Sequence, residues 1–156
     1  MSAVVLTETP KTFTKDPNLS KYKIDTEYGI ESEKICLPLL KTKFDPFLIK
    51  NENRYAIFDY VGVSHFIELK TRRYNSDKYP DTMIGCNKIK NALKVEGRKV
   101  VFCFKFEDGL FYWEFDKEKI PNLDLRLGGR IDRGKDERRP YYFIKIADMI
   151  KIEINN

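Results

Sequence analysis

The stretch HFIELKTRR, residues 65–73, alternates apolar and charged side chains with the two-residue period of a β-strand. This alternation places Glu68 and Lys70 together on one face and the aliphatic residues between them on the other. A carboxylate and an ammonium group on one face of an otherwise apolar strand indicate either a solvated strand with a surface ion pair or a functional site. The neighbouring sequence helps to decide between these two interpretations.

The preceding segment RYAIFDY, residues 54–60, is rich in β-branched and aromatic residues and predicts a second strand, joined to the first by a turn at Gly62. A symmetrical turn at this glycine pairs Asp59 with Phe66 and makes Asp59 a diagonal neighbour of Glu68 on the same face. A slip of one residue would move Asp59 to the opposite face. The register of this hairpin therefore determines whether two carboxylates and a lysine come together.

Two carboxylates that approach each other in a partly buried position repel, so that one takes a proton or a cation binds between them. Hard divalent cations such as Mg²⁺ prefer carboxylate oxygens and retain several waters. A neighbouring lysine can orient or deprotonate an attacking water, or neutralise charge that develops on a phosphate. Asp59, Glu68 and Lys70 therefore provide the components of metal-assisted phosphodiester hydrolysis.

The pair of motifs FDY and IELK resembles the PD-(D/E)xK nuclease superfamily, in which an acid ends one strand and acid-x-Lys follows on the next. The sequence departs from the family motif at Phe58, which precedes Asp59 where the motif has proline. The resemblance extends over roughly residues 27–116 and implies a restriction-endonuclease-like core. It also implies a metal-dependent endonuclease of nucleic acid, with DNA favoured over RNA and Mg²⁺ as the cofactor, for which Mn²⁺ can substitute.

The resemblance implies a role for each site residue. Asp59 and Glu68 would bind the metal, and Lys70 would position the hydrolytic water. Members of the family also carry a glutamate on a helix before the hairpin; Glu33 or Glu31 in GIESEK is similar in position, and Glu33 is favoured as a catalytic residue and metal ligand. Two alternatives stay open: a catalytically inactive nucleic-acid-binding or structural protein on the same scaffold, and a protein-interaction domain.

Five basic residues are candidate nucleic-acid contacts. Arg72 and Arg73 follow the motif strand in a segment that also holds Tyr74 and Tyr79, while the others are Lys88, Arg130 and Arg133. Cationic groups grip phosphates and tyrosines stack on bases. The two arginine-rich segments also suit hydrated loops. Lys88 is similar in position to a polar or basic residue that faces the site from a helix after the motif strand in the family, and an ordinary surface lysine is the alternative.

The whole sequence predicts an α/β (α+β) domain with a central mixed β-sheet flanked by helices. Residues 1–20 are expected to form a flexible N-terminal arm and residues 21–156 a single nuclease-like domain. After the arm, a helix is expected over 26–44, with Ser32 as N-cap and a kink or break at Pro38. A second helix is expected over 82–95, with Ile84, Ile89 and Leu93 directed inward. Strands are expected over 99–106 and 110–116, followed by a Gly/Arg-rich loop over 125–139 and a final strand from 140.

Composition adds weaker constraints. The net charge of +5 and pI near 9.0 favour a polyanionic partner. The three cysteines are far apart and form no CxxC motif, which favours a reducing compartment. The sequence shows no signal peptide and no apolar run of about 18 residues, so a soluble intracellular protein, cytoplasmic or nuclear, is expected. A viral or phage origin and a homodimer are both compatible with these features.

Overall fold

The computed structural model describes residues 21–53, 55–132 and 136–154. The predicted arm over 1–20 and Arg133 lie outside these ranges. The elements, in chain order, are α1 (Lys21–Lys43), β1 (Ile49–Lys50), β2 (Tyr60–Val61), β3 (His65–Thr71), β4 (Asp81–Gly85), α2 (Cys86–Leu93), β5 (Lys99–Phe106), β6 (Gly109–Glu114), the 3-10 helix η3 (Lys117–Asn122), β7 (Asp124–Gly128), β8 (Arg139–Lys145), the 3-10 helix η4 (Ile146–Asp148) and β9 (Ile150–Lys151).

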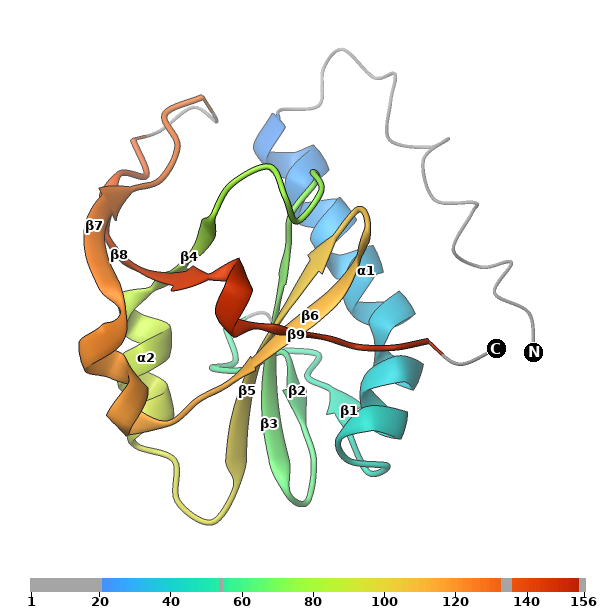
Figure 1. Ribbon diagram of the computed structural model, residues 1–156. Coiled ribbons are helices and arrows are strands. Elements are labelled where there is room, and N and C mark those ends of the chain that lie inside the picture. Colours follow the sequence, from blue (N-terminus) through green and yellow to red (C-terminus); the bar gives the residue numbers. More distant parts are fainter. Residues whose placement is uncertain (1–20, 54, 133–135, 155–156) are drawn as a thin grey trace.

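The strands form two sheets (Figure 1). The larger sheet has the order β1-β2-β3-β5-β6-β9; β3 and β5 are parallel, and the other neighbours are antiparallel. The smaller sheet has the order β4-β8-β7 and is antiparallel. The prediction of a mixed central sheet flanked by helices is confirmed. In the part of the chain that the structure describes, no helix is both long and apolar enough to cross a bilayer.

Helix α1 covers one face of the larger sheet. Its buried residues Cys36 and Leu40 pack in one core cluster with Ile67 of β3 and Cys103 of β5. The predicted start at Ser32 is wrong, because the helix begins at Lys21 and Ser32 is a buried residue inside it. The helix also continues through Pro38 to Lys43 without being split. Burial of apolar residues on both sides of the proline offsets its cost of about 3 kcal/mol.

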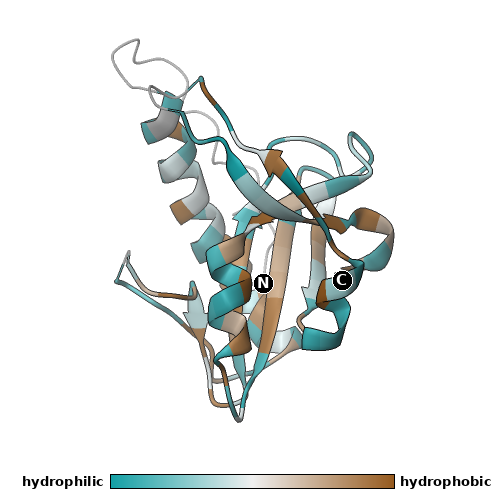
Figure 2. Cartoon of the chain, turned by 90° about the vertical axis from the view of Figure 1, so that its left-hand side faces the viewer, coloured by the Kyte–Doolittle hydropathy of each residue, from teal (hydrophilic) through white to brown (hydrophobic). Residues whose placement is uncertain are grey.

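Helix α2 covers the opposite face and packs against the aromatic residues of β5. Ile89 and Ala92 lie in a second core cluster with Phe102, Phe104 and Ile144, and Figure 2 shows hydrophobic residues along the strands in the middle of the molecule.

The predicted helix over 82–95 is partly wrong, because its first residues form β4, which pairs with β8 far along the chain. Ile84 and Ile89 are buried as expected, but Leu93 is 50% exposed.

Two other sequence predictions need correction. The first part of the predicted loop over 125–139 is strand β7, which pairs with β8 because Gly128 lets Phe143 and Met83 approach closely: a Cβ there would lie 3.1 Å from atoms of each.

The predicted strand over 54–60 is reduced to its last residue, Tyr60, which begins β2. Side chains of Asn51 and Asn53 accept backbone N–H groups two residues further on and hold the preceding segment in turns.

The β2–β3 hairpin has a register two residues away from the predicted one. Tyr60 pairs with Ile67 and Val61 with Phe66, so the turn lies one residue later than expected. Asp45 explains this shift: its Oδ2 accepts hydrogen bonds from the backbone N–H (2.8 Å) and the hydroxyl (3.0 Å) of Ser64 inside the turn. A shift of two residues keeps every side chain on its predicted face, and the predicted association of Asp59 with Glu68 survives.

Candidate active site

Glu68 is the buried centre of the site. It lies in the middle of β3, 2% exposed, on the sheet face covered by α2. Its Oε2 lies 3.1 Å from Lys70 Nζ and 3.0 Å from Lys88 Nζ. Its other oxygen, Oε1, is buried and has no hydrogen-bond partner among the described residues. One oxygen of Glu68 is thus neutralised by two ammonium groups, while the other retains unused capacity to accept a hydrogen bond or to bind a cation.

Asp59 lies just before β2, and its side chain is hydrogen-bonded to the backbone of β3. Its Oδ2 accepts the backbone N–H of Leu69 at 2.8 Å, so the carboxylate satisfies a strand donor at a position that β2 does not reach. Burial, and then the negative charges of Glu68 and Glu33, raise the pKa of Asp59 to about 8, against the opposing effects of the Leu69 N–H and Lys70. Near neutral pH this carboxyl group therefore holds a proton unless a cation replaces it.

Glu33 approaches the site from α1. Its Oε2 lies 3.4 Å from Lys50 Nζ, and its backbone carbonyl accepts a hydrogen bond from the hydroxyl of Tyr60. Its charge raises the pKa of Asp59, and its side chain lines the cleft described below, whereas Glu31 does not. Of the two glutamates that the sequence offered, Glu33 is the one whose position fits the site.

The two lysines reach Glu68 from different elements. The side chain of Lys70 on β3 is 32% exposed, and that of Lys88 on α2 is 18% exposed. Lys88 Nζ also donates to the carbonyl of Ile57 at 2.9 Å. Lys88 is therefore directed into the site and is not an ordinary surface lysine. Lys50, the partner of Glu33, is a site residue that the sequence analysis missed.

A cleft of about 1030 Å³ opens beside these residues, and both Glu33 and Lys70 line it. Its walls come from the first half of α1, the end of β3 with the segment after it, β4, β7 with the residues that follow it, and β8. The cationic residues that line it are Lys70, Arg72, Arg73, Lys78, Arg126 and Arg130; the acidic ones are Asp25, Glu33 and Asp81; the tyrosines are Tyr28, Tyr74 and Tyr79. The excess of cations suits a polyanionic ligand.

The predicted nucleic-acid-binding arginines differ in what they contact. Arg72 donates from Nε to Thr82 Oγ1 (2.8 Å) and from Nη2 to the carbonyl of Met83 (2.7 Å), so its guanidinium is bound to β4. Arg73 and Arg130 instead pair with Asp25, at 3.4 and 3.1 Å. Among the described residues, the structure thus brings Arg73 and Arg130 together at the cleft and gives Arg72 a structural role.

The donor set fits a hard cation only in part. No group of three or more His, Cys, Asp or Glu side chains within residues 21–53, 55–132 and 136–154 converges closely enough to hold a metal ion. Asp59 and Glu68 nevertheless offer carboxylate oxygens of the type that Mg²⁺ prefers. Glu68 Oε1 is buried without a hydrogen-bond partner, and the pKa of Asp59 is raised by burial and by the charges of Glu68 and Glu33. These two residues would hold the metal, and Glu33 could join them after release from Lys50.

An acid directly before one strand, Glu-x-Lys on the next, and helices on both faces of a mixed sheet are the features of a PD-(D/E)xK-type nuclease. Residues 25–156 match the family described as "Phage putative PDDEXK endonuclease", and the chain belongs to this family.

Among solved structures, the chain is similar to a Holliday junction resolvase from Archaeoglobus fulgidus, with a TM-score of 0.42 and 13% sequence identity, over 73% of this chain and 84% of that one. No curated protein matches the sequence.

Proposed function

We propose that the protein is a divalent-metal-dependent endonuclease that hydrolyses phosphodiester bonds of nucleic acid, DNA more readily than RNA. The observation that supports this best is that Asp59 and Lys70 converge on the buried carboxylate of Glu68. The Oε1 atom of that carboxylate has no hydrogen-bond partner among the described residues. The cation-rich cleft beside them can hold a nucleic-acid backbone. Membership in a phage endonuclease family is consistent with this activity.

Each residue has a distinct role in the proposed reaction. Asp59 would give up its proton to bulk water as a metal ion binds, and its carboxylate together with that of Glu68 would hold Mg²⁺ or Mn²⁺, with Glu33 assisting. When bound, a divalent metal would act as a Lewis acid towards a phosphoryl oxygen and would lower the pKa of its bound water. Lys70, the more exposed of the two lysines on Glu68, positions the attacking water at the cleft. Lys88 limits the negative charge at Glu68 and ties α2 to the segment before β2.

The proposal is tested by incubating plasmid DNA and single-stranded DNA with the protein, with Mg²⁺ or with EDTA. Wild-type protein should cut only with Mg²⁺, and Lys70→Ala should cut about 10²–10⁴-fold more slowly, because a group that acts on the water is lost. Lys90→Ala, an exposed lysine on α2, is the matched control and should cut like wild type. Equal background cutting by wild type and Lys70→Ala on every substrate would rule out catalysis.

Metal binding separates this enzyme from an inactive scaffold of the same fold. Titration calorimetry with Mn²⁺ should show binding to wild-type protein that Asp59→Asn abolishes. Because the proton on Asp59 competes with the metal, the affinity should increase with pH until about pH 8 and then level off. A scaffold without a working site should give no binding that depends on Asp59.

A further inference from the structure

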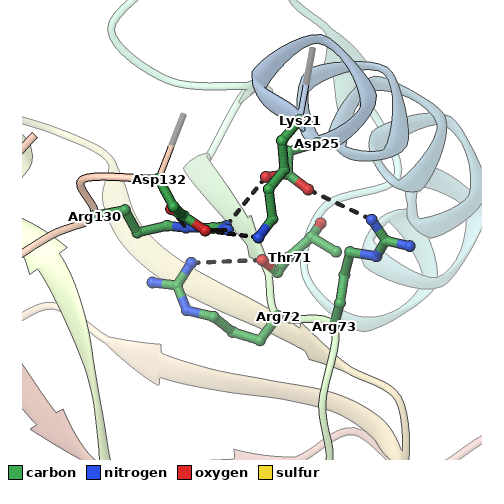
Figure 3. Close-up of polar contacts among 7 residues, drawn as sticks. All are labelled: Lys21, Asp25, Thr71, Arg72, Arg73, Arg130 and Asp132. Atoms are coloured by element: carbon green, nitrogen blue, oxygen red, sulfur yellow. Dashed lines mark hydrogen bonds and ion pairs between the residues drawn. The ribbon is translucent and has the colours of Figure 1, made fainter. Parts of the chain in front are cut away.

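One wall of the cleft is a network of ion pairs between segments far apart in the sequence (Figure 3). Arg130 Nη1 lies 3.1 Å from Asp25 Oδ2, and Arg73 Nη1 lies 3.4 Å from Asp25 Oδ1. Asp132 Oδ2 lies 2.7 Å from Arg130 Nη2 and 2.6 Å from Lys21 Nζ. These five residues, here called the α1–β7 latch, join the first turns of α1 to the segment that follows β7.

The latch completes a ring of elements around the cleft. Helix α1 contacts β3, the chain continues from β3 through residues 72–80 to β4, and β4 pairs with β8, which pairs with β7. The latch then connects the end of β7 back to α1. Because every element of this ring contributes lining residues, a bound chain would be flanked by protein on several sides.

The enclosed space is small for a duplex. Its volume of about 1030 Å³ is close to the upper end of ordinary ligand pockets, about 300–1,000 Å³. The major groove of duplex DNA is by itself about 12 Å wide, so a continuous duplex would have to break the latch in order to enter. A single strand of a few nucleotides requires no such opening.

The lining carries the groups that bind single strands. Tyr79 is 49% exposed, and its ring meets that of Tyr74 edge to face at 5.3 Å between centroids. Lys78 Nζ lies 5.5 Å from each of these ring centroids. Across the cleft, the guanidinium of Arg73 lies 4.7 Å from the ring centroid of Tyr28. A basic groove with accessible aromatic rings tracks a phosphate backbone while the bases stack on the rings.

We propose that this cleft selects single-stranded DNA, either free or as an unpaired segment of a branched molecule, over continuous duplex. The phosphates lie along the cationic side chains that line the cleft while the latch stays closed, and a base stacks on Tyr79. The α1–β7 latch and Tyr79 are the specificity determinants. That the bound strand is then cut rests on the proposed function; the preference in binding does not.

Binding is measured in EDTA, so that nothing is cut, by fluorescence anisotropy with a labelled oligothymidine and a blunt GC-rich duplex of equal length. Wild-type protein should bind the single strand at least tenfold more tightly than the duplex. Tyr79→Ala should weaken single-strand binding at least about fivefold through loss of one stacked base. Tyr55→Ala removes a tyrosine that is 83% exposed and outside the cleft, and should leave binding unchanged.

The latch is tested with Asp25→Ala against Asp124→Ala. Both changes remove one acidic group, but Asp124 lies on the exposed part of β7 and does not line the cleft. Asp25→Ala should reduce the ratio of single-strand to duplex affinity at least threefold, because the ring opens, and Asp124→Ala should leave this ratio unchanged. Circular dichroism of each variant confirms that it is folded.

Three results would overturn the inference. The first is equal affinity of the wild-type protein for the two DNAs, and the second is an equal effect of Tyr79→Ala and Tyr55→Ala. The third is the same ratio of single-strand to duplex affinity for Asp25→Ala and Asp124→Ala. These outcomes differ from failure of the proposed function. Mg²⁺-dependent cutting together with equal affinity for duplex and single strand in EDTA would keep the proposed function and overturn this inference. A strong single-strand preference in EDTA without any cutting would keep the inference and remove the proposed function.

Discussion

Glu68 is a buried carboxylate balanced by two ammonium groups that come from different elements. Lys70 lies two residues away on the same strand, and Lys88 reaches the same oxygen from α2. A buried charge is tolerated while a partner remains and becomes costly once no partner remains. Each lysine therefore compensates for loss of the other, and their contributions to stability should depend on each other.

This dependence predicts a non-additive result for Lys70→Met and Lys88→Met. Each single change should lower the free energy of unfolding by about 1–2 kcal/mol, and the double change by more than the sum, at least about 4 kcal/mol, because Glu68 is then buried without a cation. Urea unfolding at pH 7.5 measures these values. Lys90→Met, an exposed position on α2, should change stability by less than about 0.5 kcal/mol. Additive losses from the two lysines would contradict the shared role.

Asp59 predicts how stability depends on pH. Burial first, and then the charges of Glu68 and Glu33, raise its pKa to about 8. The folded chain binds this proton more tightly than the unfolded chain, so the free energy of unfolding falls as the pH increases from about 4 to about 8. Asp59→Asn keeps an oxygen for the N–H of Leu69 but cannot ionise.

Metal-free Asp59→Asn should therefore match wild type near pH 4 and be more stable above pH 8. One unit of pKa shift corresponds to about 1.4 kcal/mol. Because water reaches the site and weakens the electrostatic effects, the gain in the free energy of unfolding of Asp59→Asn is expected to be on the order of 3 kcal/mol. Urea unfolding in EDTA at pH 4, 6 and 8.5 measures the difference. Parallel stability curves for the two proteins would show that Asp59 ionises normally.

The local pattern predicts some site residues and leaves others hidden. Glu68 and Lys70 are separated by two positions on one strand, so alternation alone places them together. Lys88 and Lys90 both stand on α2, and only packing against β3 distinguishes the lysine that reaches Glu68. Lys50 meets Glu33 through the contact of β1 with α1, and no spacing rule connects residues so far apart.

At the scale of elements, the β2–β3 hairpin depends on a close contact between Gly62 and Asp45. A Cβ at Gly62 would lie 2.2 Å from Asp45 Oδ2, the atom that holds the turn through Ser64. A side chain here must displace the buried aspartate or distort the turn. Either change would disturb the hairpin that carries Asp59 and Glu68.

Gly62→Ala should therefore lower the free energy of unfolding by about 1–3 kcal/mol, as expected for an overpacked position, and should weaken Mn²⁺ binding. Gly29→Ala is the matched change in the interior of α1, where a Cβ meets no atom within 4 Å. It should raise stability by about 0.5–1 kcal/mol, because alanine favours the helix. Urea unfolding and Mn²⁺ titration measure both variants. Equal effects of the two substitutions would contradict the role of Asp45.

The elements that the sequence predicted correctly are those with strong local patterns. Strand β5, KVVFCFKF, is buried on both faces, and its continuous run of apolar residues was sufficient to identify it. Strands β4 and β7 were missed because each is defined by pairing with β8, and β4 runs directly into α2 at Gly85. The hairpin register was missed by two residues because Asp45, which fixes the turn, lies outside the hairpin.

At the scale of the whole molecule, two neighbouring arginines connect the sheets and the cleft in different ways. Arg72 follows the larger sheet and donates to Thr82 and to the carbonyl of Met83, both on β4 of the smaller sheet. Arg73 turns towards α1, where it pairs with Asp25 and lies over Tyr28. The first arginine holds the two sheets together, and the second belongs to the cationic lining of the cleft.

This difference predicts opposite results for the two positions. Arg72→Lys keeps the charge but loses the guanidinium geometry, and should lower the free energy of unfolding by about 1–3 kcal/mol because buried acceptors lose their donor. The slope of log affinity against log salt for single-stranded DNA should stay unchanged.

Arg73→Ala should change stability by less than about 1 kcal/mol, since exposed ion pairs contribute little, and should reduce that slope by about 0.7, the value for one phosphate contact on a single strand. Urea unfolding and anisotropy titrations at four salt concentrations measure both quantities. A reduced slope for Arg72→Lys with unchanged stability would mean that Arg72 faces the DNA and that the two sheets are held together by other contacts.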